Sequence, residues 1–365
     1  MIQSVEIKNY RNLDKLKINS FSTVNLITGK NNTGKSSLLE AIAIYVSNGN
    51  MRLIYDILKE RGEYYRIYEN TKDNRIQTYI NSLSSLFTDR NFSFDKKNTI
   101  LINTTENNEE KFISLRFVKY YKEIIQKEDS RIFQTKIIEN EEEKEIIDYN
   151  IGFEVKIDEN STLIKQLDLY RPYNFDYTNS NFQFIKTKNV DRENNGELWD
   201  KIALTDKENF VIEGLKIIEP DIERLTFVSE DRIRKAVIKL KDKKDILPLK
   251  SMGDGINRIL TIILALVNCE NGFLFIDEFE NGLHYSVQEN LWKVIFSLSK
   301  KLNIQIFATT HSNDSIYSFQ KVINIEENLA NGKLIRLDYK DNQVKEVEFD
   351  ANELKIATEE GIEIR

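Results

Sequence analysis

The stretch that decides the fold is residues 24–46, VNLITGKNNTGKSSLLEAIAIYV. Its first part is an apolar run typical of a buried strand, and its last part has the length and composition of a helix. Between them, residues 29–36 read GKNNTGKS and fit the pattern G-x-x-x-x-G-K-[ST], in the strand-then-helix context that the pattern requires. Two glycines let the backbone curl so that its N–H groups point inward, and a helix N-terminus adds partial positive charge. The segment is therefore predicted to cradle phosphate groups.

Within this loop, two side chains have distinct expected roles. Lys35 is expected to reach the β- and γ-phosphates of a nucleoside triphosphate, and the Ser36 hydroxyl to ligate Mg²⁺. The alternative, a chance glycine-rich loop, is disfavoured by the flanking strand and helix. The loop residues expected to bind the nucleotide are Gly29, Asn31, Asn32, Thr33, Gly34, Lys35, Ser36 and Ser37.

A second motif is the apolar run FLFI, residues 273–276, which ends in Asp277 and Glu278. A strand without polar residues is typical of a parallel sheet buried on both faces, and such sheets bind ligands at the carboxyl ends of their strands. Asp277 is expected to hold Mg²⁺ through water, and Glu278 to polarise the attacking water. The alternative is two solvated acids at a strand end.

Two further segments lie in the same half of the chain. The apolar run 304–310, IQIFATT, leads into His311 and Ser312, which is either a functional edge or the start of a helix capped by Ser312. The segment 249–258, LKSMGDGINR, precedes an apolar helix. A serine, two glycines and a helix N-terminus can bind a phosphate group, and the alternative is a glycine-rich helix start.

The motifs and their order resemble one known family. The order is the phosphate loop, S-M-G-D-G-x-x-R, F-I-D-E-x-E-N-G-L-H and A-T-T-H-S. It is similar to the ABC-type AAA ATPases of the OLD-like group, which is related to the RecF and SMC heads and includes ATPase subunits of bacterial antiphage systems. The match covers residues 1–50 and 245–320. It implies an α/β P-loop NTPase of the ABC-ATPase type, with a largely antiparallel β subdomain and an inserted helical and β region.

The resemblance also implies roles and cofactors. ATP and Mg²⁺ are expected, and His311 is expected to contact the γ-phosphate and position the water, completing a catalytic set with Lys35 and Glu278. The family pattern L-S-G-G-Q is replaced here by S-M-G-D-G, which is expected to meet ATP held by a second chain, as is the turn after the acidic strand. The arginine of Asn9-Tyr10-Arg11, similar to the family's N-F-R element, is expected near the nucleotide. The residues added to the nucleotide-binding set in this way are Arg11, Ser251, Gly253, Gly255 and Asn281.

Two positions stay open. His284, in the turn after the acidic strand, is as consistent with a packed or surface residue as with a functional one. The glutamine that this family carries in its Q-loop has no clear counterpart. Gln183 is one candidate, although an ordinary strand residue is the favoured interpretation.

Composition restricts the class of protein. The 365 residues carry a net charge of −7, one cysteine and two histidines. The acidic balance disfavours a DNA-wrapping protein but still allows a local basic patch for nucleic acid. The histidine count disfavours a histidine-rich zinc site and favours a hard metal ion held by oxygen. No apolar run reaches 18 residues, no signal peptide is evident, and one cysteine cannot form a disulfide within the chain, so the expected location is the cytoplasm without a membrane partner.

The pattern along the chain predicts four parts. Residues 1–50 form the first part of the ATPase head, and residues 51–204 form an insertion that is helical and then an antiparallel meander, with residues 139–145 as a solvated hairpin tip. Residues 205–325 complete the head, with capping boxes expected at Thr205/Glu208 and Ser286/Glu289. Residues 326–365 are expected to form a hairpin and a short helix.

The partners follow from the resemblance. Only 54 residues follow His311, too few for the TOPRIM nuclease domain of OLD proteins, so the chain is expected to control a separately encoded effector, such as a TOPRIM-type nuclease. A homodimer or higher homo-oligomer around ATP is expected. The alternatives are a RecF- or SMC-like DNA-repair ATPase and a scaffold or sensor that binds ATP with little turnover. The pair Asp277 and Glu278 argues against the scaffold.

Overall fold

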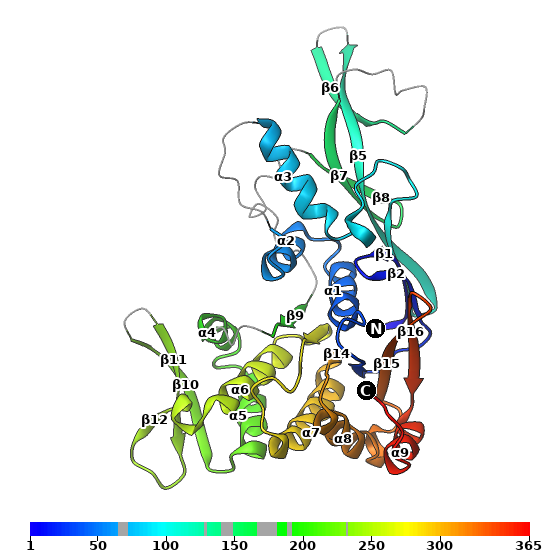
Figure 1. The fold of residues 1–365 in the computed structure, drawn as a ribbon. Coiled ribbons are helices and arrows are strands. Elements are labelled where there is room, and N and C mark those ends of the chain that lie inside the picture. Colours follow the sequence, from blue (N-terminus) through cyan, green and yellow to red (C-terminus); the bar gives the residue numbers. More distant parts are fainter. Residues whose placement is uncertain (65–71, 128–129, 140–148, 166–180, 188–191, 231–232) are drawn as a thin grey trace. The chain divides into compact units, whose positions relative to one another are not determined.

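The computed structural model describes residues 1–64, 72–127, 130–139, 149–165, 181–187, 192–230 and 233–365 (Figure 1). The chain divides into two compact units, each made of segments that are separate in the sequence. Unit 1 comprises residues 1–3, 19–39 and 179–365, and unit 2 comprises residues 4–18 and 40–178. No helix among the described residues combines the length and apolar composition needed to cross a bilayer.

Unit 1 is built on a six-stranded sheet with the order β16-β15-β3-β14-β13-β9. Five neighbouring strands are parallel, and β16 lies antiparallel at the edge. The inner strands β3 and β14 are buried throughout, as their apolar sequences predict for a sheet covered on both faces. The bounds are β3 Val24–Thr28, β9 Phe182–Ile185, β13 Phe273–Ile276, β14 Gln305–Thr309, β15 Gly332–Lys340 and β16 Gln343–Phe349.

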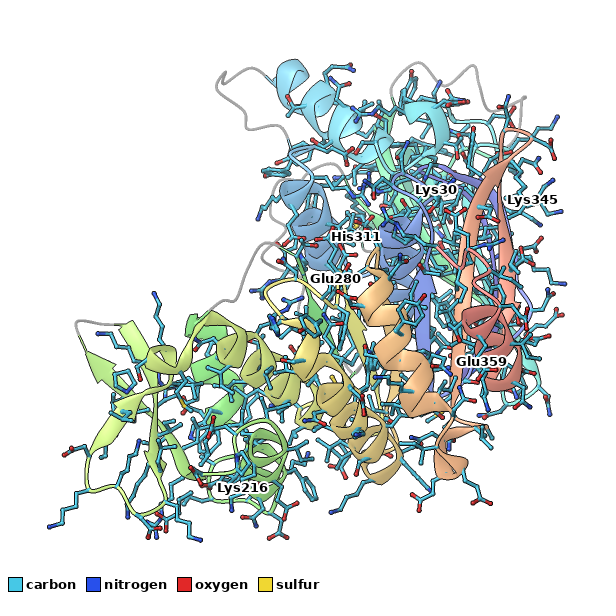
Figure 2. The ribbon with its side chains drawn as sticks, turned by 60° about the horizontal axis from the view of Figure 1, so that its bottom comes forward. Lys30, Lys216, Glu280, His311, Lys345 and Glu359 are labelled. Atoms are coloured by element: carbon cyan, nitrogen blue, oxygen red, sulfur yellow. The ribbon has the colours of Figure 1, made fainter. Side chains whose placement is uncertain are left out.

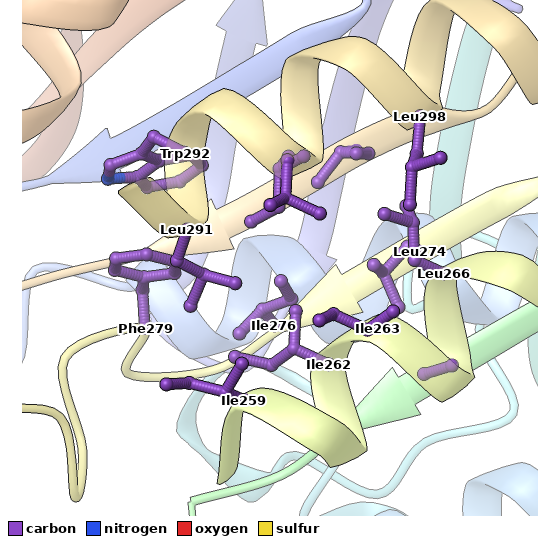
Figure 3. Close-up of a cluster of buried hydrophobic side chains, with 14 of the residues drawn as sticks. Ile259, Ile262, Ile263, Leu266, Leu274, Ile276, Phe279, Leu291, Trp292 and Leu298 are labelled. Carbon is purple, nitrogen blue, oxygen red and sulfur yellow. The ribbon is translucent and has the colours of Figure 1, made fainter. Parts of the chain in front are cut away.

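Helices pack on this sheet through a shared apolar core. Figure 3 shows side chains of α6, β13 and α7 gathered in one cluster, including Ile263, Ile276 and Leu291, and all three are fully buried. Burying an aliphatic side chain of this size contributes about 1.5–3 kcal/mol, so the cluster fixes the sheet against the helices. The helices of unit 1 are α4 Arg192–Asp200, α5 Lys207–Ile218, α6 Asp254–Val267, α7 Tyr285–Leu302, α8 Asn313–Ile323 and α9 Ala351–Glu359, with short 3₁₀ turns η5 Leu249–Met252 and η6 Glu326–Asn328.

A small antiparallel sheet completes unit 1. It has the order β10-β11-β12, with β10 Ile222–Glu230, β11 Ile233–Leu240 and β12 Ile246–Pro248. Its buried side chains, Leu225 and Ile238 among them, join the same core as α6. The sheet leads directly into η5 and α6, so it is part of the support of the segment SMGDG.

Unit 2 contains a seven-stranded antiparallel sheet with the order β2-β1-β4-β5-β7-β8 and β6 paired to β5. The bounds are β1 Ile2–Tyr10, β2 Leu13–Ile18, β4 Ile100–Glu106, β5 Glu109–Lys127, β6 Ser130–Ile137, β7 Asn150–Ile157 and β8 Asn160–Ile164. It also holds the helices α2 Met51–Glu60 and α3 Lys72–Ser84 and the 3₁₀ turn η1 Thr88–Arg90. Helix α1, Lys35–Val46, begins in unit 1 and ends in unit 2.

The fold class is confirmed: an α/β P-loop architecture with an antiparallel β subdomain. The antiparallel meander predicted for the later part of residues 51–204 is wrong at its end, because β9 pairs in parallel with β13 and belongs to the sheet of unit 1. Strand β9 has only four residues, with a polar residue on either side. This is too short to show a periodicity that would separate a parallel edge strand from a meander strand. Residues 140–145 of the expected hairpin tip lie outside the described residues, and Glu139 is exposed.

Both predicted capping boxes are wrong. Helix α5 starts one residue after Asp206, and the Glu208 side chain accepts from the backbone N–H of Leu204 instead of Thr205. Helix α7 is capped by His284, whose ring nitrogen Nδ1 accepts from the N–H of Ser286, while Glu289 pairs with Lys293. A full capping box forms elsewhere, at Asp350 and Glu353, where α9 begins.

Candidate functional site

The loop between β3 and α1 has the curled backbone that its glycines predict. The φ angles are +139° at Gly29, +64° at Asn32 and +93° at Gly34. A Cβ atom on Gly29 would lie 2.3 Å from the carbonyl oxygen of Leu337 in β15, so the loop is pressed against the neighbouring strand. A side chain at Gly29 would clash with β15, and one at Gly34 would be strained by its positive φ, which explains why both positions are glycine.

Lys35 lies folded over this loop. Its Nζ donates to the carbonyl oxygens of Gly29 at 2.7 Å and Lys30 at 2.9 Å. Desolvation lowers the pKa of Lys35, and the nearby carboxylates of Asp277, Glu280 and Glu278 partly offset this effect. The ammonium group is thus held at the loop by neutral carbonyl oxygens. The anionic oxygens of a phosphate can take the place of these acceptors and form stronger hydrogen bonds with it.

Three hydroxyl groups, one from the start of a helix and two from strand ends, converge on one carboxylate. Ser36, at the start of α1, donates to Asp277 Oδ1 at 3.0 Å, and Thr309, at the end of β14, donates to the same atom at 2.8 Å. Thr187, after β9, donates to Asp277 Oδ2 at 3.1 Å. We call Ser36, Thr187, Asp277 and Thr309 the Asp277 cluster.

The Asp277 cluster fits a hard divalent cation. Ser36 and Asp277 offer oxygen ligands within hydrogen-bond distance of each other beside the phosphate loop, which are the donors that Mg²⁺ prefers. Across the described residues no group of three or more acidic, histidine or cysteine side chains forms a complete metal cage. Phosphate and water would supply the other ligands, as is usual for Mg²⁺.

A second acidic group lies beside the Asp277 cluster. His311 Nδ1 lies 3.1 Å from Glu280 Oε1 and 3.9 Å from Glu278 Oε1, and Figure 2 shows His311 and Glu280 side by side. Glu280 also accepts from the backbone N–H of His311 and the hydroxyl of Thr310, so it fixes the turn that carries the histidine. The structure brings His311 and Glu278 to one edge of the sheet, as the sequence predicted.

Arg258 of α6 joins the helix to the ends of two strands. Its side chain is almost fully buried and donates to the carbonyl oxygens of Lys186 and Asp277, both at 3.2 Å, and of Glu278 at 3.4 Å. Desolvation lowers the pKa of this guanidinium despite the nearby acids. The helix that follows SMGDG is therefore bonded to the backbone of the acids in the same chain.

The segment SMGDG lies at the exposed start of α6. The Ser251 hydroxyl donates to the carbonyl of Pro248 at 2.8 Å, and Gly253 has a φ of +104° with no atom within 4 Å of an added Cβ. Ser251 and Gly253 are exposed, and their described contacts do not include the Asp277 cluster. Gly255 faces the turn after β13, where an added Cβ would lie 3.2 Å from the carbonyl oxygen of Gly282.

In that turn, the exposed Asn281 donates to the carbonyl of Thr187 at 2.7 Å. Its expected contact with a second chain stays a prediction, and its contact within the chain holds the Thr187 backbone. His284 is exposed and serves as the helix cap described above. Gln183 lies within β9 opposite Leu274, whereas Thr187 beyond the strand end reaches Asp277.

Arg11 belongs to unit 2, where it is buried. Its Nε lies 3.0 Å from Glu40 Oε2 and its Nη1 lies 2.7 Å from Glu63 Oε2. The φ angle of Arg11 is +53°, which suits a tight turn between β1 and β2. The described structure gives Arg11 a pairing with two carboxylates, and its expected contact with the nucleotide stays a prediction.

The remaining loop residues lie as follows. Asn31 and Thr33, with Lys30, line a cavity of about 470 Å³ whose other walls are β15 and the residues Glu363 and Arg365. Ser37 is buried, and the Thr33 hydroxyl donates to the Lys30 carbonyl at 2.9 Å.

Sequence reasoning missed Thr187, Thr309, Glu280 and Arg258 as members of the site. Thr309 and Glu280 lie in the quoted motifs ATTHS and FIDEFENGLH, so their position at strand ends was a usable signal. Arg258 stood in the quoted pattern without a role. Thr187 had no signal, because it follows the strand that was assigned to the meander.

The fold and the site together define a P-loop nucleoside triphosphatase of the α/β type. The sequence profile of the AAA ATPase domain family matches residues 1–316, so the chain belongs to this family and is an ATPase. An "ATP/GTP phosphatase" of Helicobacter pylori is 28% identical over 376 aligned positions, which cover 94% of each chain. The DNA replication and repair protein RecF of Rickettsia prowazekii is 31% identical over 68 residues, covering 18% of this chain and 19% of RecF.

Among solved structures, the chain is similar to the SMC head crystallised with the C-winged helix domain of ScpA. The TM-score is 0.54 at 13% identity, and the match covers 98% of this chain and 99% of that chain. At this identity the likeness concerns the fold. It is the same fold that the phosphate loop and the acidic strand predicted.

Proposed function

We propose that the chain hydrolyses ATP with Mg²⁺ at the Asp277 cluster, and that two copies enclose two ATP molecules. Lys35 would bind the β- and γ-phosphates, Ser36 and Asp277 would hold the cation, and Glu278 with His311 would orient the attacking water. The observation that carries the proposal is the convergence of Ser36 on Asp277 at 3.0 Å, directly beside the loop that Lys35 covers.

The residues act mainly by position and charge. Bound Mg²⁺ neutralises charge on the phosphates. Glu278 has a φ of +50° and its N–H donates to the Thr309 hydroxyl at 2.9 Å, so its backbone is held in an uncommon conformation. This fixes the direction of the carboxylate that would accept the proton of the water. His311 Nδ1 lies within hydrogen-bond distance of Glu280 and 3.9 Å from Glu278, so Glu280 is placed to orient the ring beside the carboxylate of Glu278.

The proposed pairing rests on the placement of SMGDG. Ser251 and Gly253 are exposed at the start of a 14-residue helix, where backbone N–H groups and the helix dipole favour an anion. In the proposed dimer these residues, with Gly255 and Asn281, would meet the ATP held by the Lys35 loop of the other copy.

Three variants test this proposal. Lys35→Ala should lose ATP affinity, and Glu278→Gln should keep affinity while ATP turnover falls about 100-fold or more, because a positioned general base contributes that much. Glu278→Gln should also accumulate an ATP-dependent dimer, measured by mass in solution with and without ATP and Mg²⁺. Glu359→Gln, an exposed position on α9, is the matched control and should behave as wild type. Turnover by Glu278→Gln at the wild-type rate would refute the assignment of the acid.

We further propose that the ATP cycle controls a separately encoded effector, of the kind found in OLD-like antiphage systems. The support is a comparison: an SMC head of the same fold has been solved bound to a domain of another protein. Co-purification with the product of an adjacent gene, dependent on ATP and lost in Lys35→Ala, would test it. Failure of every neighbouring product to bind would count against it.

The second candidate is a RecF-like DNA-repair ATPase, favoured by the RecF similarity over 68 residues. A footprint on DNA that depends on ATP and weakens steeply with salt would support this candidate. An ATPase rate that DNA leaves unchanged, with no footprint, would favour the effector.

A further inference from the structure

The loop after β9 contributes a hydroxyl that has the same relation to Asp277 as the hydroxyl of the phosphate loop. Ser36 lies 3.0 Å from Asp277 Oδ1, and Thr187 lies 3.1 Å from Asp277 Oδ2. Both side chains are half-buried, so both hydroxyls are shielded but not enclosed. They approach one carboxylate from the start of helix α1 and from the segment after β9, and Ser36 also lies 3.3 Å from Asp277 Oδ2.

Thr309, the third hydroxyl of the Asp277 cluster, differs from these two. This residue is 1% exposed. Its hydroxyl oxygen accepts a hydrogen bond from the backbone N–H of Glu278 at 2.9 Å, and its hydroxyl donates a hydrogen bond to Asp277. Its donor and one of its two lone pairs are thus used within the protein, and its side chain is buried, which together give it a structural role. Ser36 and Thr187 are the hydroxyls that are placed for a further ligand.

The segment that carries Thr187 is fixed by the protein at three points. The backbone N–H of Asp277 donates to the carbonyl of Ile185 at 2.8 Å, and Arg258 donates to the carbonyl of Lys186 at 3.2 Å. Asn281 donates to the carbonyl of Thr187 itself at 2.7 Å. Three bonds on three consecutive residues hold the hydroxyl at a defined place, as a preorganised ligand requires.

We propose that Thr187 is a third protein oxygen for the divalent cation, alongside Ser36 and Asp277. This inference rests on the proposed function, because it assigns a residue to the cation of that same site. A neutral hydroxyl from β9 adds a ligand without adding charge, and it suits a hard cation that keeps several waters and phosphate oxygens. The contact between Thr187 and Asp277 then has the same explanation as the contact between Ser36 and Asp277. In each case two ligands of one cation lie next to each other.

The experiment exchanges the oxygen for sulfur. A thiolate favours soft cations over Mg²⁺, so Thr187→Cys should bind a fluorescent ATP analogue weakly with Mg²⁺ and regain affinity with Cd²⁺. The native chain has one cysteine, Cys269, which is fully buried, so the background for Cd²⁺ is low and is measured on wild type. Ser36→Cys should show the same preference and is the positive reference.

Two conservative variants accompany the exchange. Thr187→Val keeps the shape and removes the oxygen, and it should raise the Mg²⁺ concentration for half-maximal binding of the analogue about 10-fold. Thr187→Ser keeps the oxygen and should stay close to wild type. These readouts are binding measurements at equilibrium and do not depend on turnover.

The outcomes separate this inference from the function beneath it. If Ser36→Cys gains affinity with Cd²⁺ and Thr187→Cys does not, Thr187 only orients Asp277 and the inference is overturned while the proposed function stands. If neither variant responds to Cd²⁺ and Lys35→Ala keeps its affinity for ATP, the proposed site itself is wrong. A Cd²⁺ response in both variants supports the inference.

Discussion

Replacing Gly29 by alanine tests whether the phosphate loop depends on its contact with β15. The new Cβ would lie 2.3 Å from the carbonyl oxygen of Leu337, against an ordinary carbon–oxygen contact of about 3.3 Å. It would also lie 2.9 Å from the Thr33 hydroxyl. Overpacking of this kind costs about 1–3 kcal/mol, and a side chain at a φ of +139° adds about 1–2 kcal/mol. We expect Gly29→Ala to lower the free energy of unfolding by about 2–5 kcal/mol.

Gly361→Ala is the matched control in the same unit. Gly361 has a φ of +66° and no atom within 4 Å of an added Cβ, so only the backbone cost of about 1–2 kcal/mol applies. Both tryptophans, Trp199 and Trp292, lie in unit 1, and their fluorescence in a denaturant titration reports the unfolding of this unit. Affinity for ATP should fall in Gly29→Ala alone. Equal unfolding midpoints for the two variants would show that the contact with β15 does not restrict the loop.

Three other predictions concern buried groups. Arg258→Met should lower the free energy of unfolding by about 2–4 kcal/mol, since it removes the buried side-chain donor shared by three backbone carbonyls; Arg258→Lys should lose less, and tryptophan fluorescence checks both. Burial raises the pKa of the Cys269 thiol, so alkylation at pH 8 should be slow in the folded chain and fast in denaturant; rapid labelling of the folded chain would contradict this. Burial opposes ionisation of Glu348, but bonds from Lys333, Ser20 and Asn19 outweigh it and hold the pKa below its ordinary value. Its contribution to stability is therefore present above the pKa of the unfolded chain and lost on acidification, so Glu348→Gln should cost stability at pH 7 and little near pH 3; an equal cost at both pH values would refute this.

The phosphate loop and the acidic strand were predictable because each combines a strong pattern with a fixed context. The strand 273–276 has the predicted bounds, and the helix predicted to follow Lys35 begins one residue earlier, at Lys35 itself. Local sequence determines both, since the apolar runs are unbroken and the glycines stand where the backbone requires positive φ. The hairpin of β15 and β16 was also predicted, and it is confirmed.

The site around Asp277 was predictable only in part, because parallel strands bring together residues that are far apart in sequence. Thr187 lies 90 positions from Asp277, and no local pattern indicates that the short strand before it joins β13. The capping boxes failed because helix starts are defined by local pattern only to within one or two residues. Thr205 and Ser286 stand close to helix starts, but the N-cap positions are taken by Asp206 and His284.

The near contact of Gly255 with Gly282 gives the proposed pair of chains a means of communication. The start of α6 rests on the turn that contains Asn281, and that turn holds the backbone of Thr187. If ATP held by a second chain bound at the exposed start of α6, it would therefore contact a segment that also lies against the catalytic edge of the first chain. ATP binding by one chain of the pair would then affect the catalytic edge of the other, and hydrolysis at the two sites would be coupled.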